Sequence, residues 1–356
     1  MLRARFPVCA QHAYLNAGTN GPLAEATVAA MGAELQRELA EGRTSAGFRR
    51  RGELACQLRA RYAGLLACAP EEVALTTCTS EGLFIVLAGL DLRAGDEILT
   101  SDQEHPGLLG ALQALRDLHG VRISVAPFAR IADAVGARTR LVACSHVSWV
   151  TGELAPRELA EVGARLPLLL DGAQGIGAVP TDVHELHASA YAGAGQKWLC
   201  GPDGIGMLYV RPDLREQLAV PRRGYGNFRE PDGGLEALLH EDARRFDSFA
   251  LSAPLLAGAI AALDVLEQPG LRAFQEHAIA LAGELADALA ERGRQPAARH
   301  AGTLISFQSA DPAGERERLA AAGVIVRDIP GHQLLRASVG AWNNHADIRR
   351  LLGALP

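Results

Sequence analysis

The chain has 356 residues, more than one ordinary hydrophobic core fills, so its length predicts one large domain with a smaller one beside it. The composition is 48% hydrophobic and 21% charged, with 38 Gly and 18 Pro, which is typical of a compact α/β protein and excludes a disordered or collagen-like chain. The formal net charge is -6 and arginines alternate with acidic residues throughout, so no basic surface is offered to nucleic acid or anionic lipid. We expect neither as a partner.

The first part of the chain alternates strand and helix patterns. Apolar spacing predicts helices over about 22–42 and 50–67. The following predicted elements are, in order, a strand at 72–76, a helix that opens near Ser80, a strand at 97–100, a helix at about 107–119, strands at 122–125 and 141–144, a helix at about 156–165 and a strand at 168–170. This alternation predicts a mostly parallel sheet covered by helices.

The second part predicts one more strand and then a smaller α+β unit. The remaining predicted elements are a strand at 205–210, a loop and linker over 212–247, two helices at about 253–267 and 270–293, a strand at 303–307, a helix at 314–322, strands at 324–327 and 334–338, and a helix at 345–355. We therefore expect a large domain over 16–240 and a small domain made of 1–15 and 241–356.

The six cysteines contain no C-x-x-C pair, which predicts reduced, mostly buried thiols instead of a zinc ribbon or a disulfide framework. His184 and His187 have no third ligand at a suitable spacing, so no metal site is predicted. The N-terminus lacks the apolar region of an export signal, and no later run approaches the roughly 20 apolar residues of a membrane span. We expect a cytoplasmic protein.

Lys197 is the strongest candidate for chemistry. It is the only lysine in the chain, and every other basic residue among the 35 Lys+Arg is an arginine. It follows the small-residue stretch 192–195 and precedes Trp198, so a flat ligand could come close and burial would free the amine as a nucleophile. The alternative is a surface lysine, but a single retained lysine indicates chemistry that arginine cannot perform.

Asp171 follows the apolar run 167–170, where a buried carboxylate needs a partner to stay ionised. A protonated pyridine nitrogen would be such a partner, and Gln174 could donate to the ring hydroxyl of the same cofactor. A helix cap or a turn-forming aspartate is the alternative. Thr79 and Ser80 follow another predicted strand, at a helix N-terminus that would suit a phosphate or would need only a capping serine.

His105 and Arg336 are the remaining candidates from the residues alone. His105 could stack on a planar ring and move protons, or it could be a hydrogen-bonded loop histidine. Arg336 lies on a predicted strand and could bind a carboxylate bidentately, although the chain is rich in arginine. No P-loop pattern occurs, and the glycine-rich runs do not match a dinucleotide fingerprint, so nucleotide binding is not predicted.

Together these segments resemble the class V aminotransferase family, the fold-type I pyridoxal-phosphate enzymes that include cysteine desulfurases, selenocysteine lyases and isopenicillin N epimerase. The resemblance spans almost the whole chain. The segments that carry it are 14–18 with Gly21-Pro22, 79–82, 104–106, 145–152, 171–174, 196–198 with Gly201-Pro202 and 204–206, and 336–338.

The resemblance implies a role for each candidate residue. Lys197 would bind the cofactor as a Schiff base, Asp171 the ring nitrogen, His105 the ring face, and Thr79 and Ser80 the phosphate. Gln174 and Gln196 would contact the cofactor as well, while Asn16 and Arg336 would bind the substrate, with the α-carboxylate on Arg336. The resemblance also implies an amino-acid substrate and a homodimer with active sites at the interface.

The chain departs from the family pattern in three places, two of which concern the phosphate contacts and one the reaction. Ala194-Gly195-Gln196 replaces a common Ser-x-His before the lysine, and Phe249-Ala250 replaces a Gly-Thr pair that often reaches the partner's phosphate. The segment 326–333, where desulfurases carry a persulfide cysteine, has none, and no cysteine follows Cys200. We therefore expect a β-elimination lyase that cleaves a C–S bond without a persulfide relay. Transamination and epimerisation begin with the same residues and stay open, and a non-catalytic binding protein is a remote alternative.

Overall fold

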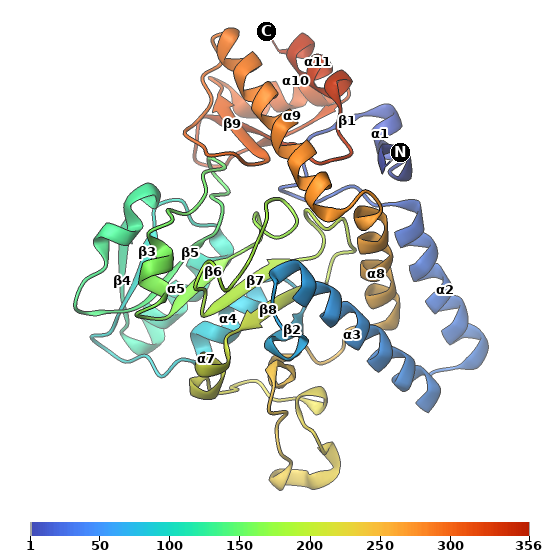
Figure 1. The fold of residues 1–356 in the computed structure, drawn as a ribbon, viewed down its shortest axis with the longest axis vertical. Coiled ribbons are helices and arrows are strands. Elements are labelled where there is room, and N and C mark those ends of the chain that lie inside the picture. The colour runs from blue at the N-terminus through green and yellow to red at the C-terminus, as the bar shows by residue number, and fades with distance from the viewer. Residues whose placement is uncertain (1, 356) are drawn as a thin grey trace.

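A seven-stranded sheet forms the centre of the computed structural model, which describes residues 2–355 (Figure 1). The strand order is β2-β8-β7-β6-β5-β3-β4. The strands are β2 (Val73–Thr76), β3 (Glu97–Ser101), β4 (Arg122–Ala126), β5 (Thr139–Ser145), β6 (Leu168–Asp171), β7 (Ala190–Ala194) and β8 (Gly206–Val210). Only β8 is antiparallel to its neighbours β2 and β7, and the other adjacent pairs are parallel. The prediction of a mostly parallel sheet is therefore confirmed.

Helices cover both faces of this sheet. They are α2 (Glu25–Glu41), α3 (Ser45–Leu66), α4 (Thr79–Gly89), α5 (Pro106–His119), α6 (Leu159–Gly163), α7 (Pro212–Gln217) and α8 (Ala253–Glu267). The apolar strand β6 shows why two layers form, since Leu168 and Leu170 join the core beneath α3 and α8 whereas Leu169 joins the core beneath α4 and α5. Alternate side chains of a strand point to opposite faces, so a continuous apolar run requires cover on both.

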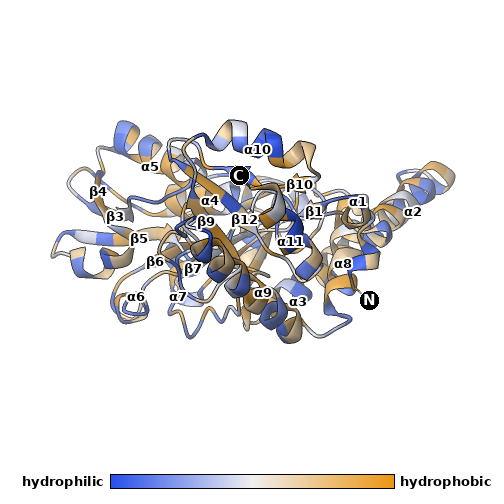
Figure 2. Ribbon diagram, turned by 90° about the horizontal axis from the view of Figure 1, so that it is seen from above, coloured by the Kyte–Doolittle hydropathy of each residue, from blue (hydrophilic) through white to orange (hydrophobic). Residues whose placement is uncertain are grey.

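A smaller α+β unit is built mainly from the C-terminal part of the chain. Its elements are α9 (Leu271–Glu291), β9 (Leu304–Gln308), α10 (Pro312–Ala321), β10 (Val324–Ile325), β11 (Arg327–Asp328), β12 (Leu334–Ser338) and α11 (His345–Ala354). The strands β11-β12-β9 form an antiparallel sheet with its own apolar core. Figure 2 shows α10 with both hydrophilic and hydrophobic residues. The residues of α4 are mostly apolar, and this helix packs against the large sheet.

The N-terminal segment connects the two units. After the short helix α1 (Val8–Gln11), strand β1 (Ala13–Tyr14) pairs in parallel with β10, and Asn16 forms a bridge to Ser338 at the end of β12. The chain then turns toward the large sheet, where Gly21 N donates to Gln196 O at 2.8 Å. A residue next to Lys197 is thus held by a segment that also belongs to the small sheet.

Two elements differ from the sequence-based expectations. Lys197 was expected to follow a strand, but the residue range of that strand, β7, was not predicted, because its sequence of Ala, Gly and one Tyr lacks the β-branched side chains that mark a strand. The stretch expected to be loop over 212–247 contains helix α7 and several short 3-10 helices. Among residues 2–355 no helix is both long enough and apolar enough to cross a membrane. The expected division at residue 240 stays a prediction, and α8 packs against α2 and α3 of the large unit.

Candidate active site

The sequence-predicted residues meet at one edge of the large sheet. Thr79 and Ser80 open α4 directly after β2, and His105 precedes α5 after β3. Asp171 ends β6, and Lys197 follows β7. All four strands point the same way, so their carboxyl ends lie together. Ligands of open parallel sheets bind at this edge.

The amine of Lys197 is buried and has no hydrogen-bond partner in the described chain. Nor does its Nζ atom form an ion pair there. Burial lowers the pKa of Lys197 to about 8, and the positive charge of Arg336 acts in the same direction, while the carboxylate of Asp171 partly opposes the shift. An amine with such a pKa is about one-fifth neutral at pH 7.4, far more than an ordinary lysine, and the neutral form is the one that a nucleophile or general base requires.

The turn that carries Lys197 is fixed by its backbone. Gly201 N donates to Gly195 O at 2.9 Å, and Gly195 N donates to Ile205 O at 2.9 Å. A β-carbon at Gly21 would lie 2.1 Å from Lys197 O, so only glycine permits this contact. Gln196 Oε1 is buried without a hydrogen-bond partner within the described chain. The turn therefore presents one lysine and one free amide oxygen from a rigid support.

Asp171 and Gln174 lie in the turn after β6. Asp171 Oδ1 accepts a hydrogen bond from Ala173 N at 2.9 Å, so the turn-forming role is present and leaves Oδ2 for another partner. A β-carbon at Gly172 would lie 1.9 Å from the Tyr191 ring, which explains the glycine. Gln174 Nε2 donates to Gly18 O at 2.7 Å, while its Oε1 accepts from the indole N–H of Trp198 at 3.0 Å. One Gln174 amide hydrogen remains, so its predicted contact with a ring hydroxyl stays a prediction.

The start of α4 provides unsatisfied donors. Cys78 is the N-cap residue but its side chain makes no capping hydrogen bond. Thr79 Oγ1 is buried and has no partner within residues 2–355. Ser80 lies beside the start of α5, because a β-carbon placed on Gly107 would be 2.3 Å from Ser80 Oγ and 3.1 Å from His105 Nδ1. An orphaned hydroxyl at a helix N-terminus suits a phosphate group.

His105 is oriented by its own helix. Its Nδ1 accepts a hydrogen bond from Gly107 N at 3.0 Å, so the neutral ring carries its proton on Nε2. Trp149 contacts it edge to face, with ring centroids 5.1 Å apart. Burial lowers the pKa of His105, and the charge of Lys197 adds to that shift. A neutral, fixed imidazole is suited to stacking on a flat ligand. Trp149 was part of the family-like segment but was not predicted as a site residue.

Arg336 is fully enclosed and has no acidic partner among residues 2–355. Its Nη1 donates to Trp149 O at 2.7 Å, and its Nε has no acceptor. Burial, followed by the charge of Arg327, lowers the pKa of Arg336 to about 9. Thr19 links it to Asn16, since Thr19 Oγ1 donates to Asn16 Oδ1 at 2.8 Å and lies 3.5 Å from Arg336 Nη2. A buried cation of this kind requires an anion.

Glu104 is a buried carboxyl group that the sequence reasoning did not single out. It accepts hydrogen bonds from Ser101 and from Ser145 Oγ, the latter at 2.6 Å. Burial raises the pKa of Glu104 to about 7, and the nearby Asp171 contributes in the same direction. Its position directly before His105 was the only signal in the sequence. Through these hydrogen bonds, Glu104 connects the ends of strands β3 and β5 beneath the site.

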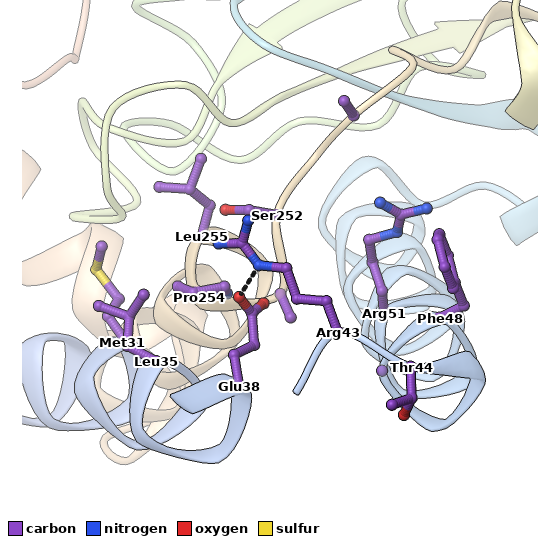
Figure 3. A pocket seen from close by; sticks show the side chains of 13 residues that line it. Met31, Leu35, Glu38, Arg43, Thr44, Phe48, Arg51, Ser252, Pro254 and Leu255 are labelled. Atoms are coloured by element: carbon purple, nitrogen blue, oxygen red, sulfur yellow. Dashed lines mark hydrogen bonds and ion pairs between the residues drawn. The ribbon is translucent and has the colours of Figure 1, made fainter. Parts of the chain in front are cut away.

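A cavity of about 610 Å³ lies away from this site, between α2, α3 and the start of α8 (Figure 3). Met31 and Leu35 on α2 and Phe48 on α3 line it, and Arg43 donates to Glu38 at 2.9 Å across its rim. It contains none of the predicted site residues. Its lining includes Ala250, which belongs to one of the departures from the family pattern.

These residues fit pyridoxal phosphate. The unpaired Lys197 amine suits its aldehyde, the orphaned Thr79 hydroxyl at the start of α4 suits its phosphate, and Asp171 has a free oxygen for its ring nitrogen. The buried and unpaired Arg336 remains for an amino-acid carboxylate. The individual assignments stay predictions, since they concern a ligand's contacts.

The chain matches the family model described as aminotransferase class-V over residues 13–351. A probable cysteine desulfurase of Pseudomonas aeruginosa is 34% identical over 318 residues, which cover 80% of this chain and 78% of that protein. An isopenicillin N epimerase of Amycolatopsis lactamdurans is 30% identical over 380 residues, with 96% of this chain and 94% of that protein covered.

Solved structures agree with these relatives. A mutant of the protein C-DES with glycine covalently linked to its pyridoxal-phosphate cofactor matches with a TM-score of 0.92 and 28% identity, and covers 99% of this chain and 98% of that one. The cystine C–S lyase C-DES in complex with its reaction product cysteine persulfide matches with a TM-score of 0.91 and 28% identity, and covers 98% of each chain. The predicted family and fold are confirmed, and the cofactor follows from both. The chain is a pyridoxal-phosphate-dependent enzyme of the aminotransferase class-V family.

Proposed function

We propose that the enzyme is a β-elimination lyase that cleaves the C–S bond of a cysteine-like or cysteine-conjugate amino acid. The proposal rests on two buried side chains of the site. Lys197 has no hydrogen-bond partner in the described chain, and Arg336 has no anionic partner there. The names of similar proteins support the reaction class, since cysteine desulfurases and a cystine C–S lyase are among them.

Arg336 positions the substrate in this proposal. Its guanidinium binds the α-carboxylate, because Nη1 is held by Trp149 O while Nε remains without an acceptor. The contact removes the cost of a buried unpaired cation. Asn16 and Thr19 flank the same guanidinium. Together they fix which substituent of the α-carbon faces the lysine.

Lys197 moves the proton. When bound, pyridoxal phosphate withdraws electrons from the substrate's α-carbon and makes its proton acidic. Lys197 Nζ, whose lowered pKa favours the neutral form, accepts that proton as a general base. Asp171 lies at the end of β6, where its carboxylate would favour a protonated ring nitrogen. His105 covers one ring face with its Nδ1 already occupied by Gly107 N.

The sulfur leaves without a covalent acceptor on the usual loop. The segment 326–333 contains no cysteine, and the last cysteine of the chain is Cys200, which is buried. Elimination releases the sulfur-containing group into solution and needs no protein thiol. A free sulfur species or a released thiol is the expected product, together with pyruvate and ammonia.

Epimerisation is the second candidate. An isopenicillin N epimerase aligns with 96% of this chain, a wider coverage than that of the desulfurase relative from Pseudomonas. Removal and return of the α-proton would use the same lysine, and transamination would start the same way. The fate of the side chain depends on its orientation in the site.

A homodimer is part of the proposal. Cyclic dimers are the commonest closed assembly, and family resemblance implies one here. The apolar cavity of Figure 3 is lined by Ala250, next to the exposed Phe249, and both stand where relatives often contact the partner's phosphate site. We propose that a second copy covers this surface. A cytoplasmic location also stays a prediction.

One set of assays tests the reaction. The purified protein is expected to be yellow, and Lys197→Ala is expected to remove that colour. Cysteine, cysteine conjugates and keto acids are then offered to the wild type. Pyruvate with a released thiol or sulfide supports the lyase. Amino transfer that depends on a keto acid, without sulfur release, contradicts it, as does racemised substrate. A colourless protein that cannot be reconstituted contradicts the cofactor assignment as well.

A further inference from the structure

A buried carboxyl group with two serine partners lies beneath the active site, and the proposed reaction does not use it. Glu104 accepts hydrogen bonds from Ser101 and from Ser145 Oγ, the latter at 2.6 Å. Ser101 ends β3 and Ser145 ends β5, so Glu104 joins two neighbouring strands at the ligand-binding edge of the sheet. Ser101 Oγ also accepts a hydrogen bond from Gln103 N at 3.2 Å, which fixes the loop that carries Glu104.

Glu104 has no counter-ion. Its side chain is 5% exposed, and no basic side chain of residues 2–355 pairs with it. Burial raises the pKa of Glu104 to about 7, and the negative charge of Asp171 acts in the same direction. A protonated carboxyl group both donates and accepts hydrogen bonds. Below that pH, Glu104 therefore binds both serine hydroxyls without placing a second negative charge near Asp171.

Glu104 connects the two residues that are expected to contact the cofactor ring. It directly precedes His105, the N-cap residue of α5. Its partner Ser145 is paired in register with Asp171 in the parallel strands β5 and β6, and His146 N donates to Asp171 O at 2.9 Å. Within residues 2–355 no hydrogen bond joins His105 directly to Asp171. The hydrogen bond between Glu104 and Ser145 therefore links the loop of His105 to the strand end of Asp171.

We propose that Glu104 is a positioning residue, which fixes Asp171 relative to His105 so that the carboxylate of Asp171 meets the ring nitrogen of the cofactor. A charge-assisted hydrogen bond is short and weakens steeply when its angle changes. A small shift of the end of β5 against β6 would therefore weaken this contact. The role concerns the cofactor and not the substrate, so it goes beyond the proposed elimination and holds equally for epimerisation.

The test compares pyridoxal phosphate with deazapyridoxal phosphate, in which a C–H group replaces the ring nitrogen. The full-length apoprotein is titrated with each ligand, and the ratio of the two dissociation constants measures the contact between Asp171 and the ring nitrogen. The wild type is expected to favour pyridoxal phosphate by about tenfold to a hundredfold, the range of a hydrogen bond to a charged group. Glu104→Ala and Ser145→Ala are expected to lower this preference by about tenfold, whereas Glu104→Gln, whose amide can replace both hydrogen bonds, is expected to retain it. Asp171→Asn gives the ratio that remains when the contact is lost.

Glu97 provides a matched control at the opposite end of β3. It is also buried and accepts hydrogen bonds from Ser124 Oγ at 2.8 Å and from Thr139 Oγ1 at 3.1 Å, so it joins β3 to its neighbours in the same way. Glu97→Ala is expected to lower the thermal stability of the protein but to leave the ratio of dissociation constants unchanged. Ser124→Ala is the corresponding control for Ser145→Ala.

The ratio separates positioning from a general loss of structure, which would weaken both ligands equally. An unchanged ratio in Ser145→Ala would overturn the proposal even if Glu104→Ala does not fold, because this variant removes only one hydroxyl group from the network. An equal fall of the ratio in Glu97→Ala would also overturn it. A wild-type ratio near one would leave Glu104 no contact to position and would overturn it as well. Turnover of a sulfur substrate does not enter the measurement, so failure of the proposed elimination would be recognised separately.

Discussion

Lys197 combines two properties that make its titration measurable. It is the only lysine of the chain, and burial lowers its pKa to about 8. The neutral amine is the form that attacks an aldehyde, so the reactive fraction rises as pH increases through that value. We expect the rate of cofactor uptake by the apoprotein to rise with pH and level off above about 8. A rate that keeps rising toward the ordinary lysine pKa of 10.5 would contradict a buried amine.

The colour of the bound cofactor reports this uptake in stopped-flow absorbance at a series of pH values. Asp171→Asn is a useful companion variant, because the Asp171 carboxylate raises the pKa of Lys197. Its removal is expected to shift the midpoint of the rate profile to lower pH.

Glu104 makes stability depend on pH in a direction that can be worked out. Its pKa is raised from 4.5 to about 7 in the folded protein, so the unfolded chain releases this proton first. Folding therefore loses stability as pH rises from about 5 to 8, by about 2 kcal/mol from this group. Glu104→Gln has no such proton and is expected to remove that part of the loss. Urea unfolding of both proteins at pH 5 and pH 8 measures the difference.

A Glu104→Gln variant that loses the same stability between these pH values as the wild type would contradict the raised pKa. The hydrogen bonds to Ser101 and Ser145 can persist in the variant, because a glutamine amide both accepts and donates. The comparison therefore isolates the charge.

At the scale of elements, the turn around Lys197 depends on its contact with the N-terminal segment. A β-carbon at Gly21 would lie 2.1 Å from Lys197 O and 2.9 Å from Cys200 Sγ. The backbone must move to admit it, so we expect Gly21→Ala to destabilise the fold by about 1–3 kcal/mol and to weaken retention of the cofactor. Thermal unfolding and the absorbance of the purified protein measure the two effects.

Gly110→Ala is the control, because Gly110 lies in the exposed part of α5 and an added β-carbon meets nothing within 4 Å. It is expected to stabilise the protein by up to about 1 kcal/mol, since alanine favours a helix more than glycine does. A neutral result for Gly21→Ala would mean that the segment adjusts freely.

Most elements could be predicted where hydrophobic spacing was regular. Helices such as α8 and strands such as β12 begin and end close to the predicted residues. The bounds of strand β7 could not be predicted, because its alanines and glycine have low strand propensity and show no alternation of polar and apolar residues. Pairing with β6 and β8 holds this segment as a strand. The same small side chains let α4 approach, since a β-carbon at Gly82 would lie 2.9 Å from that of Ala192.

The site could be predicted in part for a similar reason. Lys197, Asp171 and His105 follow strands, so sequence order alone placed them at one edge of the sheet. Trp149 and Glu104 act through contacts that depend on the final packing, the ring contact with His105 and the hydrogen bond from Ser145. Arg327 faces Arg336 only through strand register, which the sequence does not state.

For the whole molecule, the proposed dimer predicts on which surface a substitution would disrupt assembly. Leu35 is about half exposed and lines the cavity between α2, α3 and α8. A charge there has little to disrupt in the monomer but would be buried against a second copy, at a cost of a few kcal/mol. We expect Leu35→Asp to shift the protein from dimer to monomer in sedimentation equilibrium. Leu118→Asp, at an even more exposed leucine on α5, is expected to leave the dimer intact. A wild-type monomer, or equal effects of both variants, would contradict the proposed interface.

The N-terminal segment pairs with strands from the C-terminal part of the chain, and this order of pairing matters during synthesis. Strand β1 is synthesised long before its partner β10, and the bridge from Asn16 to Ser338 closes later still. The segment 16–21, which also braces the lysine turn through Gly21, therefore has no permanent neighbour while the chain is being made. The large sheet can collapse first, because its strands are all present by residue 210. We therefore expect the cofactor pocket to be completed only after synthesis, and a nascent chain halted before residue 324 to fold its sheet without holding the ligand.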